Sequence, residues 1–196
     1  MALDVIGDLL IAPVQSWDAL VCTSKAVHTA VTRILDGWAD YLEQRFTIRP
    51  ALIKMPIIPL GVDSDTLAAR GADAKVRYDL RTRMNIADDD IAILYAGRLD
   101  HVEKANPVPM LLATEIAQHS TKIKLHLIQA GQASTSKMET AFKQAATALA
   151  PNVNHHFIDG SKTEIYNGAW AAADIFISLS DNIQESFGLT PIEAMA

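Results

Sequence analysis

Two glutamates stand eight positions apart near the end of the chain, Glu185 and Glu193, with Gly188 and Pro191 between them. An apolar strand-like run at 174–180 precedes them, so the turn is expected at the carboxyl edge of a sheet. Glycine lets another group approach the backbone closely, and the Thr-Pro pair predicts a helix start with outward-facing amides. Such amides attract phosphate, and carboxylates accept paired hydrogen bonds from vicinal hydroxyls. The segment therefore indicates a ligand in which a sugar is joined to a phosphate.

The same segment has a second interpretation. The sequence TPIE at 190–193 is also the pattern of a capping box, in which Glu193 folds back onto the amide of its own cap residue Thr190. Glu193 then binds no ligand, and Glu185 is a solvated loop residue. The local sequence leaves both interpretations open.

Two cations, Arg98 and Lys104, follow the apolar run IAILYA at 91–96, which is typical of a buried strand. Arginine presents a planar fork of donors and lysine a point charge. The pair suits a diphosphate leaving group whose developing negative charge must be neutralised. The alternative is that both are surface cations paired with Asp100 and Glu103, an arrangement that contributes little stability.

The elements that must position these residues follow a regular alternation from Ile91 onward. Short β-branched apolar runs alternate with longer amphipathic stretches, so we expect an α/β fold with a Rossmann-like parallel sheet. Right-handed crossovers then place the carboxyl ends of all strands at one edge, where ligands of such sheets bind. The expected strands are 91–96, 123–130, 153–158 and 174–180, and the expected helices are 107–119, 136–150 and 162–173.

The first 70 residues have a different pattern. Residues 19–22 indicate one strand and residues 25–46 one long amphipathic helix. A lone strand and helix cannot form a stable domain, so we interpret residues 1–55 as the end of an N-terminal domain. Residues 56–70 contain two prolines and a glycine and are the expected inter-domain linker. Residues 71–196 are the expected Rossmann-like domain.

Composition limits the classes of function. The chain has 196 residues, of which 49% are hydrophobic, and a formal net charge of -6. An acidic protein without a basic patch is repelled by nucleic acid, so we expect no nucleic-acid partner. Cys22 is the only cysteine, which excludes an internal disulfide and a cysteine-based zinc site. No apolar run reaches the roughly 18 residues that span a bilayer, and we expect a cytoplasmic protein.

Two other kinds of site have weak signals. The sequences Asp-Ser-Asp at 63–65 and Asp-Asp-Asp at 88–90 match a D-x-D pattern that binds divalent metals. The first stands where a helix cap is expected and the second precedes a strand at the opposite edge, so we expect no metal. A dinucleotide-dependent dehydrogenase requires G-x-G-x-x-G after an early strand, and the sequence has none.

Most of the chain resembles a known family. The resemblance is to the retaining glycosyltransferases of family 4, also called group 1 glycosyltransferases, which have the GT-B fold of two facing Rossmann-like domains. It implies that residues 1–55 end the acceptor-side domain and that residues 71–196 are part of the nucleotide-sugar-binding domain. The segments that carry the resemblance are WDALVCTS, IIPLGVD, LYAGRLDHVEK and DIFISLSDNIQESFGLTPIEAMA.

The resemblance implies a role for each site residue. Glu185 falls on the family's glutamate that contacts the donor sugar, and Glu193 on the one that contacts the ribose. Arg98 and Lys104 fall on the cations that bind the diphosphate, although they are six residues apart where the commonest family spacing is five. The amides that contact the sugar and phosphate correspond to those near Phe187, Gly188 and Leu189.

The implied function is transfer of a sugar from a nucleotide-diphosphate donor to an acceptor with retained anomeric configuration. The partners are then a nucleotide sugar and an acceptor, which could be a saccharide, a lipid or a small molecule, and no metal is required. Family members continue after EAMA and have a glycine-rich loop near the N-terminus, so we expect a chain truncated at both ends. The alternative is a non-catalytic fragment that binds nucleotide sugar.

Overall fold

The structure is a computed structural model that describes residues 3–101, 104, 106–180 and 188–196. The chain divides into two compact units, Met1–Gly61 and Val62–Ala196. The boundary falls inside the segment 56–70, which the sequence predicts as a linker.

The first unit consists of α1 (Leu3–Gly7), the 3-10 helix η1 (Asp8–Leu10) and α2 (Lys25–Phe46). Helix α2 begins where Ser24 accepts a hydrogen bond from the Val27 amide (3.2 Å), so its sequence-predicted bounds are confirmed. Its apolar face packs around Leu35, which is fully buried. The expected strand at 19–22 forms only two isolated parallel bridges, which join Ala19 to Lys54 and Cys22 to Ile57.

The second unit alternates strands and helices, and the expected Rossmann-like α/β fold is confirmed. The first three strands begin within two residues of their predicted starts, whereas the last strand is much shorter than predicted. The elements are α3 (Ser64–Gly71), α4 (Ala74–Arg83), β1 (Ile91–Ala96), α5 (Val108–His119), β2 (Leu125–Gly131), α6 (Ser136–Leu149), β3 (Asn154–Asp159), α7 (Thr163–Ala172), β4 (Ile175–Phe176) and α8 (Leu189–Met195).

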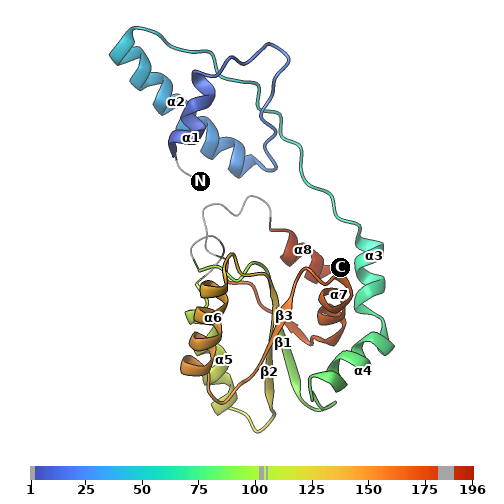
Figure 1. Cartoon of the computed structure of the whole chain (residues 1–196). Helices are drawn as coiled ribbons and strands as arrows, with labels where there is room; N and C mark the ends of the chain where they lie inside the picture. Colours follow the sequence, from blue (N-terminus) through green and yellow to red (C-terminus); the bar gives the residue numbers. More distant parts are fainter. Residues whose placement is uncertain (1–2, 102–103, 105, 181–187) are drawn as a thin grey trace. The chain divides into compact units, whose positions relative to one another are not determined.

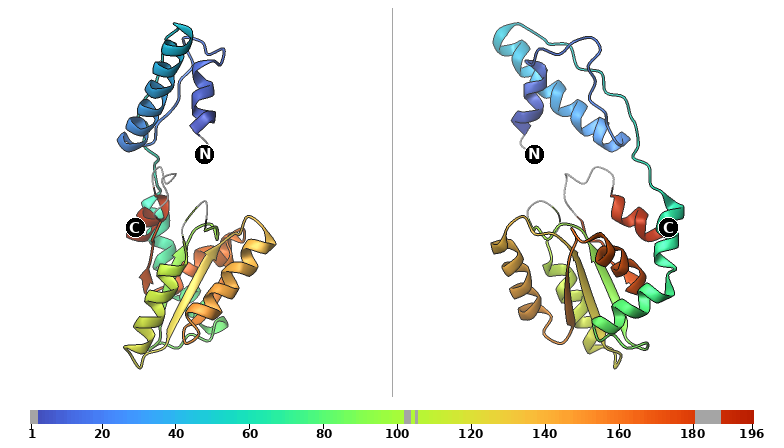
Figure 2. Two further views of the ribbon diagram at one scale, coloured as in Figure 1. Left: turned by 90° about the vertical axis from the view of Figure 1, so that its left-hand side faces the viewer. Right: turned by 45° about the vertical axis from the view of Figure 1, so that its right-hand side comes forward.

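The four strands form one parallel sheet in the order β3-β2-β1-β4 (Figure 1). Helices α5 and α6 cover one face of this sheet, and α4 and α7 cover the other (Figure 2). The chain leaves β1 toward β2 on one side and returns to β4 on the other, so the strand order reverses between β1 and β4. In open α/β sheets, ligands bind outside the carboxyl ends of the strands at such a switch point.

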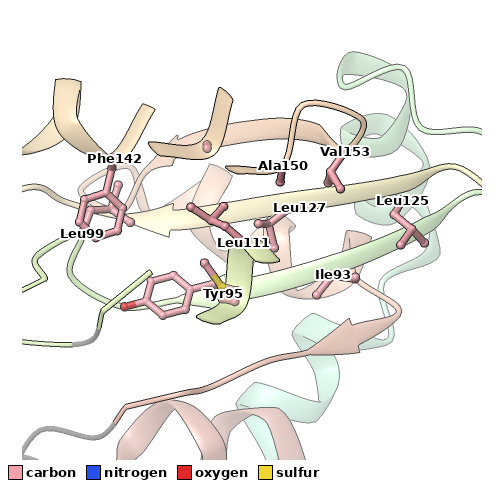
Figure 3. Close-up of a cluster of buried hydrophobic side chains, with 11 residues drawn as sticks. Ile93, Tyr95, Leu99, Leu111, Leu125, Leu127, Phe142, Ala150 and Val153 are labelled. Atoms are coloured by element: carbon pink, nitrogen blue, oxygen red, sulfur yellow. The ribbon is translucent and has the colours of Figure 1, made fainter. Parts of the chain in front are cut away.

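Strand β1 shows how the sequence builds two cores. Alternate side chains of a strand point to opposite faces. Ile93 and Tyr95 pack against α5 and α6 in the cluster of Figure 3, whereas Ala92 and Leu94 pack against α4 and α7. Both faces of the strand are therefore buried, as expected for the centre of a parallel sheet.

A charged cluster fixes the amino end of β4. One Asp174 oxygen accepts hydrogen bonds from the Ala92 amide (2.8 Å) and from Arg81 (3.0 Å), and Arg77 donates to the other. Arg81 is only 4% exposed and also donates to the carbonyls of Ala87 and Asp90. Burial works to raise the pKa of Asp174, but these hydrogen bonds hold that pKa below its ordinary value. The cluster ties β4, β1 and α4 together.

Candidate active site

Three glycines mark the carboxyl edge of the sheet. Gly97 follows β1, Gly131 ends β2, and Gly160 follows β3. A Cβ atom added to Gly131 would lie 1.8 Å from the Gly97 carbonyl oxygen, and one on Gly160 would lie 3.0 Å from the Gly131 Cα. The backbones of the three loops therefore touch, and a side chain at position 131 does not fit.

Arg98 is held at this edge by backbone pairing on both sides. The Gly97 amide donates to the Ala130 carbonyl (3.0 Å), and the Leu99 amide donates to the Gln132 carbonyl (2.9 Å). The Tyr95 hydroxyl donates to the Arg98 carbonyl (3.1 Å). The Arg98 side chain is exposed while its backbone is fixed just beyond the end of β1.

Lys104 folds back onto the same place. A Cβ added to Gly97 would lie 3.2 Å from Lys104 Cε and 3.4 Å from the Tyr95 hydroxyl, so the lysine stem covers the glycine. The Lys104 amide donates to the Asp100 carbonyl (3.1 Å). The structure thus brings Lys104 beside the backbone that carries Arg98, and the six-residue spacing does not separate them.

The acid between these cations is buried. Asp100 is 4% exposed, and its Oδ2 accepts a hydrogen bond from the Ser134 hydroxyl (2.8 Å). The Asp100 carboxylate is therefore not at the surface, because the loop turns it inward against the loop after β2. Glu103, the other acid of that interpretation, lies outside the described residues.

Helix α8 starts earlier than the sequence predicts. Its first residue is Leu189, and its N-cap is Gly188, which has a left-handed conformation (φ 76°) and no side-chain cap. The prediction of Thr190 as the cap residue is wrong, because the glycine takes up the backbone reversal and Thr190 lies within the first turn. Glu193 then stands too far into the helix for the capping box.

Glu193 lies near an aromatic side chain that the sequence analysis did not single out. Its side chain is half-buried on α8. Burial raises the pKa of Tyr166 on α7, and the negative charge of Glu193 raises it further. Tyr166 meets Trp170 edge to face with ring centroids 6.3 Å apart, and Trp170 stacks on Phe176 of β4 at 5.4 Å.

Of the remaining predicted site residues, the structure describes Gly188 and Leu189. Gly188 is half-buried and Leu189 is 39% exposed. Glu185 and Phe187 lie outside the described residues. The structure therefore places Arg98 with Lys104 and Glu193 near Tyr166, and between β4 and α8 it describes residues 177–180 and Gly188.

Comparison with known proteins identifies the family. Residues 76–196, more than half of the chain, match the family model described as "Glycosyl transferases group 1". The chain belongs to the group 1 glycosyltransferases. This confirms the family that the sequence resemblance indicates, and each predicted site residue lies within the matched region.

Individual group 1 relatives and similar folds extend the comparison. A D-inositol 3-phosphate glycosyltransferase of Geodermatophilus obscurus is 24% identical over 143 residues, which cover 71% of this chain and 30% of that protein. WaaG, a glycosyltransferase involved in lipopolysaccharide biosynthesis, has a similar fold with a TM-score of 0.57 at 19% identity, over 90% of this chain and 41% of that one. The catalytic domain of starch synthase IV from Arabidopsis thaliana gives 0.56 at 15% identity, over 90% of this chain and 37% of that one. This member of the family therefore spans about 30% of the length of its curated relative.

A cavity of about 430 Å³ opens at the same edge of the sheet, beside the loop of Arg98. Lys143 lies over the Phe157 ring, 5.6 Å from its centroid, and pairs with Glu139 (2.6 Å). Hydrogen bonds from Ser161 lower the pKa of Asp159, which stays a carboxylate. The sequence analysis missed these residues, although several follow strand ends directly. The lining residues are Leu99, Gly131, Gln132, Ala133, Glu139, Lys143, Phe157, Ile158 and Asp159.

Two kinds of feature, a metal-binding cluster and a membrane-spanning helix, are absent from the described residues. Among them, no group of three or more histidine, cysteine, aspartate or glutamate side chains has the arrangement of a metal site. Within the same part of the chain, every helix is too short or too polar to cross a membrane.

Proposed function

We propose that this chain forms the donor-binding part of a retaining glycosyltransferase that uses a nucleotide-diphosphate sugar. The observation that carries the proposal is the meeting of Lys104 with the Arg98 loop at the end of β1. This end borders the switch point between β1 and β4, where ligands of such sheets bind.

In the proposed mechanism, the two cations stabilise the diphosphate as it leaves the sugar. Arg98 is exposed on a backbone that is already fixed, so its guanidinium forms a bidentate contact with phosphate at little cost in ordering. Lys104 adds a second positive charge from the same loop. Preorganised donors of this kind each contribute on the order of 2 to 4 kcal/mol to the stability of a transition state. The proposal assigns no metal to this step.

The acids orient the rest of the donor. We propose that Glu193 binds the ribose and that Glu185 binds the transferred sugar. The amides near Phe187, Gly188 and Leu189 are assigned to the sugar and the phosphate. The name of the Geodermatophilus obscurus relative describes transfer to an inositol phosphate, and the starch synthase is described as bound to ADP. The ADP of the starch synthase supports a nucleoside diphosphate as the donor group, and the acceptor is left as a saccharide, a lipid or a small molecule.

We assign the nucleoside of the donor to a cavity at the same carboxyl edge of the sheet. The cavity beside Leu99 and Gly131 has a volume of about 430 Å³, within the range of small-ligand pockets. Because Leu99 follows Arg98 in the chain and lines this cavity, we assign the nucleoside of the donor to it.

A second candidate function is binding of nucleotide sugar without catalysis. It is favoured by the extent of the match, since the chain spans 30% of the length of its curated relative. In that case, the donor is held by Glu193 and by the loop that carries Arg98 and Lys104. A separate polypeptide segment then supplies the part that binds the acceptor.

Calorimetric titration of the full chain with UDP, GDP and ADP tests the proposal, followed by assays of donor hydrolysis. Binding of one nucleotide that is weakened in Lys104→Ala but unchanged in Lys124→Ala supports the donor site, because Lys124 precedes β2 at the opposite edge. Turnover in addition to binding distinguishes the enzyme from the binding fragment. Absence of binding by all three nucleotides, or turnover that survives loss of both Arg98 and Glu185, contradicts the proposed mechanism.

A further inference from the structure

A side-chain hydrogen bond joins the loop after β1 to the loop after β2. The Ser134 hydroxyl donates to Asp100 Oδ2 across 2.8 Å. Asp100 also uses its backbone, since its carbonyl accepts the Lys104 amide at 3.1 Å. One residue thus contacts the β2 loop through its side chain and Lys104 through its main chain. We name this pair of contacts the Asp100 clasp.

The negative charge of the buried Asp100 carboxylate does not contribute to phosphate binding. Asp100 is 4% exposed, and its negative charge repels an anion at the neighbouring cations. Burying a carboxylate is costly unless it is hydrogen-bonded. A contribution of Asp100 to donor binding must therefore come from the shape that it gives to the loop.

The two cations differ in how firmly they are held without the clasp. Arg98 lies between two backbone hydrogen bonds that continue the pairing of β1 with β2, those of Gly97 and Leu99. Lys104 lies further along the loop, and its amide bonds to Asp100. The Asp100 carbonyl is thus a backbone contact through which the clasp can act on Lys104.

A second contact docks the same loop onto α6. His101 Nδ1 lies 3.0 Å from the Met138 sulfur, in the first turn of that helix. Ser134 stands just before Thr135, the N-cap residue whose hydroxyl accepts the Met138 amide (3.1 Å). Ser134 is therefore attached to a helix start with its own cap, and it gives Asp100 a fixed partner.

We propose that Asp100 and Ser134 are positioning residues, whose hydrogen bond holds Lys104 in place to bind the diphosphate of the donor. The inference rests on the proposed function for its consequence in binding. The clasp acts through the Asp100 carbonyl on the Lys104 backbone, and neither Asp100 nor Ser134 contacts the donor in this arrangement.

The test compares Ser134→Ala in two backgrounds by titrating the full chain with the tightest-binding of UDP, GDP and ADP. We expect a loss of affinity of about five- to tenfold in the otherwise unchanged chain, as for loss of one typical hydrogen bond. In the Lys104→Ala background, the same substitution is expected to change affinity by less than about twofold, because the positioned group is gone. An equal loss in both backgrounds, or no loss in either, overturns the proposal.

Two matched variants distinguish loss of the Asp100–Ser134 hydrogen bond from a nonspecific effect of substitution in this segment. Ser134→Thr keeps the hydroxyl and is expected to retain the affinity of the unchanged chain. Ser136→Ala removes a hydroxyl from an exposed residue of the same segment and is expected to leave binding unaltered. Loss of affinity in Ser136→Ala equal to that in Ser134→Ala contradicts the assignment.

Hydrogen exchange, measured without nucleotide, tests the clasp independently of the proposed function. Hydrogen exchange at the Lys104 amide is expected to be faster in Ser134→Ala than in Ser136→Ala, because the Asp100 carbonyl that accepts this amide is no longer held. If no nucleotide binds but exchange responds, the proposed function fails while the clasp stands. If nucleotide binds and exchange is unchanged, the clasp fails.

Discussion

The carbonyl oxygen of Gly97 lies so close to Gly131 that a methyl group at position 131 would stand 1.8 Å from it. The ends of β1 and β2 thus meet backbone to backbone, immediately before Arg98. Any change that separates them moves the residue that we assign to the donor diphosphate.

Substituting Gly131 with alanine is expected to weaken both stability and nucleotide binding. The methyl group must push the Gly97 carbonyl away, and backbone displacement of this kind costs about 1 to 3 kcal/mol. Gly37→Ala in α2 is the matched control, since no atom lies within 4 Å of its added Cβ, and it is expected to stabilise by about 0.5 to 1 kcal/mol. Urea unfolding monitored by circular dichroism measures both, and a neutral Gly131→Ala would show that the contact relaxes freely.

Arg81→Met is expected to destabilise the second unit by about 3 kcal/mol. Arg81 is 4% exposed and joins Asp174 to the carbonyls of Ala87, Asp90 and Ala172, so its removal leaves these groups without their shared donor and takes one of two arginines from the Asp174 carboxylate. Lys143→Gln breaks the exposed pair with Glu139 and is expected to cost less than about 1 kcal/mol. Equal urea midpoints for the two variants would contradict the role given to the Asp174 cluster.

Stability is expected to fall as the pH drops from 6.5 toward 4 because of His156. Burial, and then the charges of His126 and His155, lower the pKa of His156 from 6.5 to about 4. Between these values the unfolded chain binds a proton that the folded chain does not, so acid favours unfolding. On the same side of the sheet, His156 Nε2 lies 2.9 Å from His126 Nδ1, and His126 Nε2 lies 3.2 Å from Asp90.

The measurement is the difference between urea midpoints at pH 7 and pH 5, in the unchanged chain and in His156→Gln. Glutamine fills similar space without titrating, so the variant is expected to lose part of the pH dependence. Carboxylates titrate in both proteins and cancel in the comparison. An identical difference in the two proteins would mean that His156 does not contribute.

The sequence predicts the second unit better than the contacts within it. The run at 91–96 locates β1, because a strand buried on both faces is apolar throughout, whereas β2 and β3 form although their runs include polar residues. The last strand is shorter than predicted, since its ladder with β1 includes only Ile175 and Phe176. The start of α8 was predicted at Thr190, but Gly188 takes up the left-handed conformation that the turn requires.

Site contacts that depend on strand register are not visible in the sequence. Asp100 and Ser134 are 34 positions apart, and they meet because β1 pairs with β2 in the register that sets Ala96 opposite Ala130. Lys104 and Gly97 meet through a turn of the loop. Motif spacing found Arg98 and Lys104, whereas the buried acid that joins their loop to its neighbour required the structure.

The preference for a diphosphate over a monophosphate tests the central claim most directly. We expect the full chain to bind one nucleoside diphosphate at least tenfold more tightly than the corresponding monophosphate, since Arg98 and Lys104 contact the additional phosphate. Changing both residues to alanine is expected to remove that preference, and Lys124→Ala to retain it. Equal affinities for the two nucleotides in the unchanged chain, or a preference that survives the double substitution, would contradict the account.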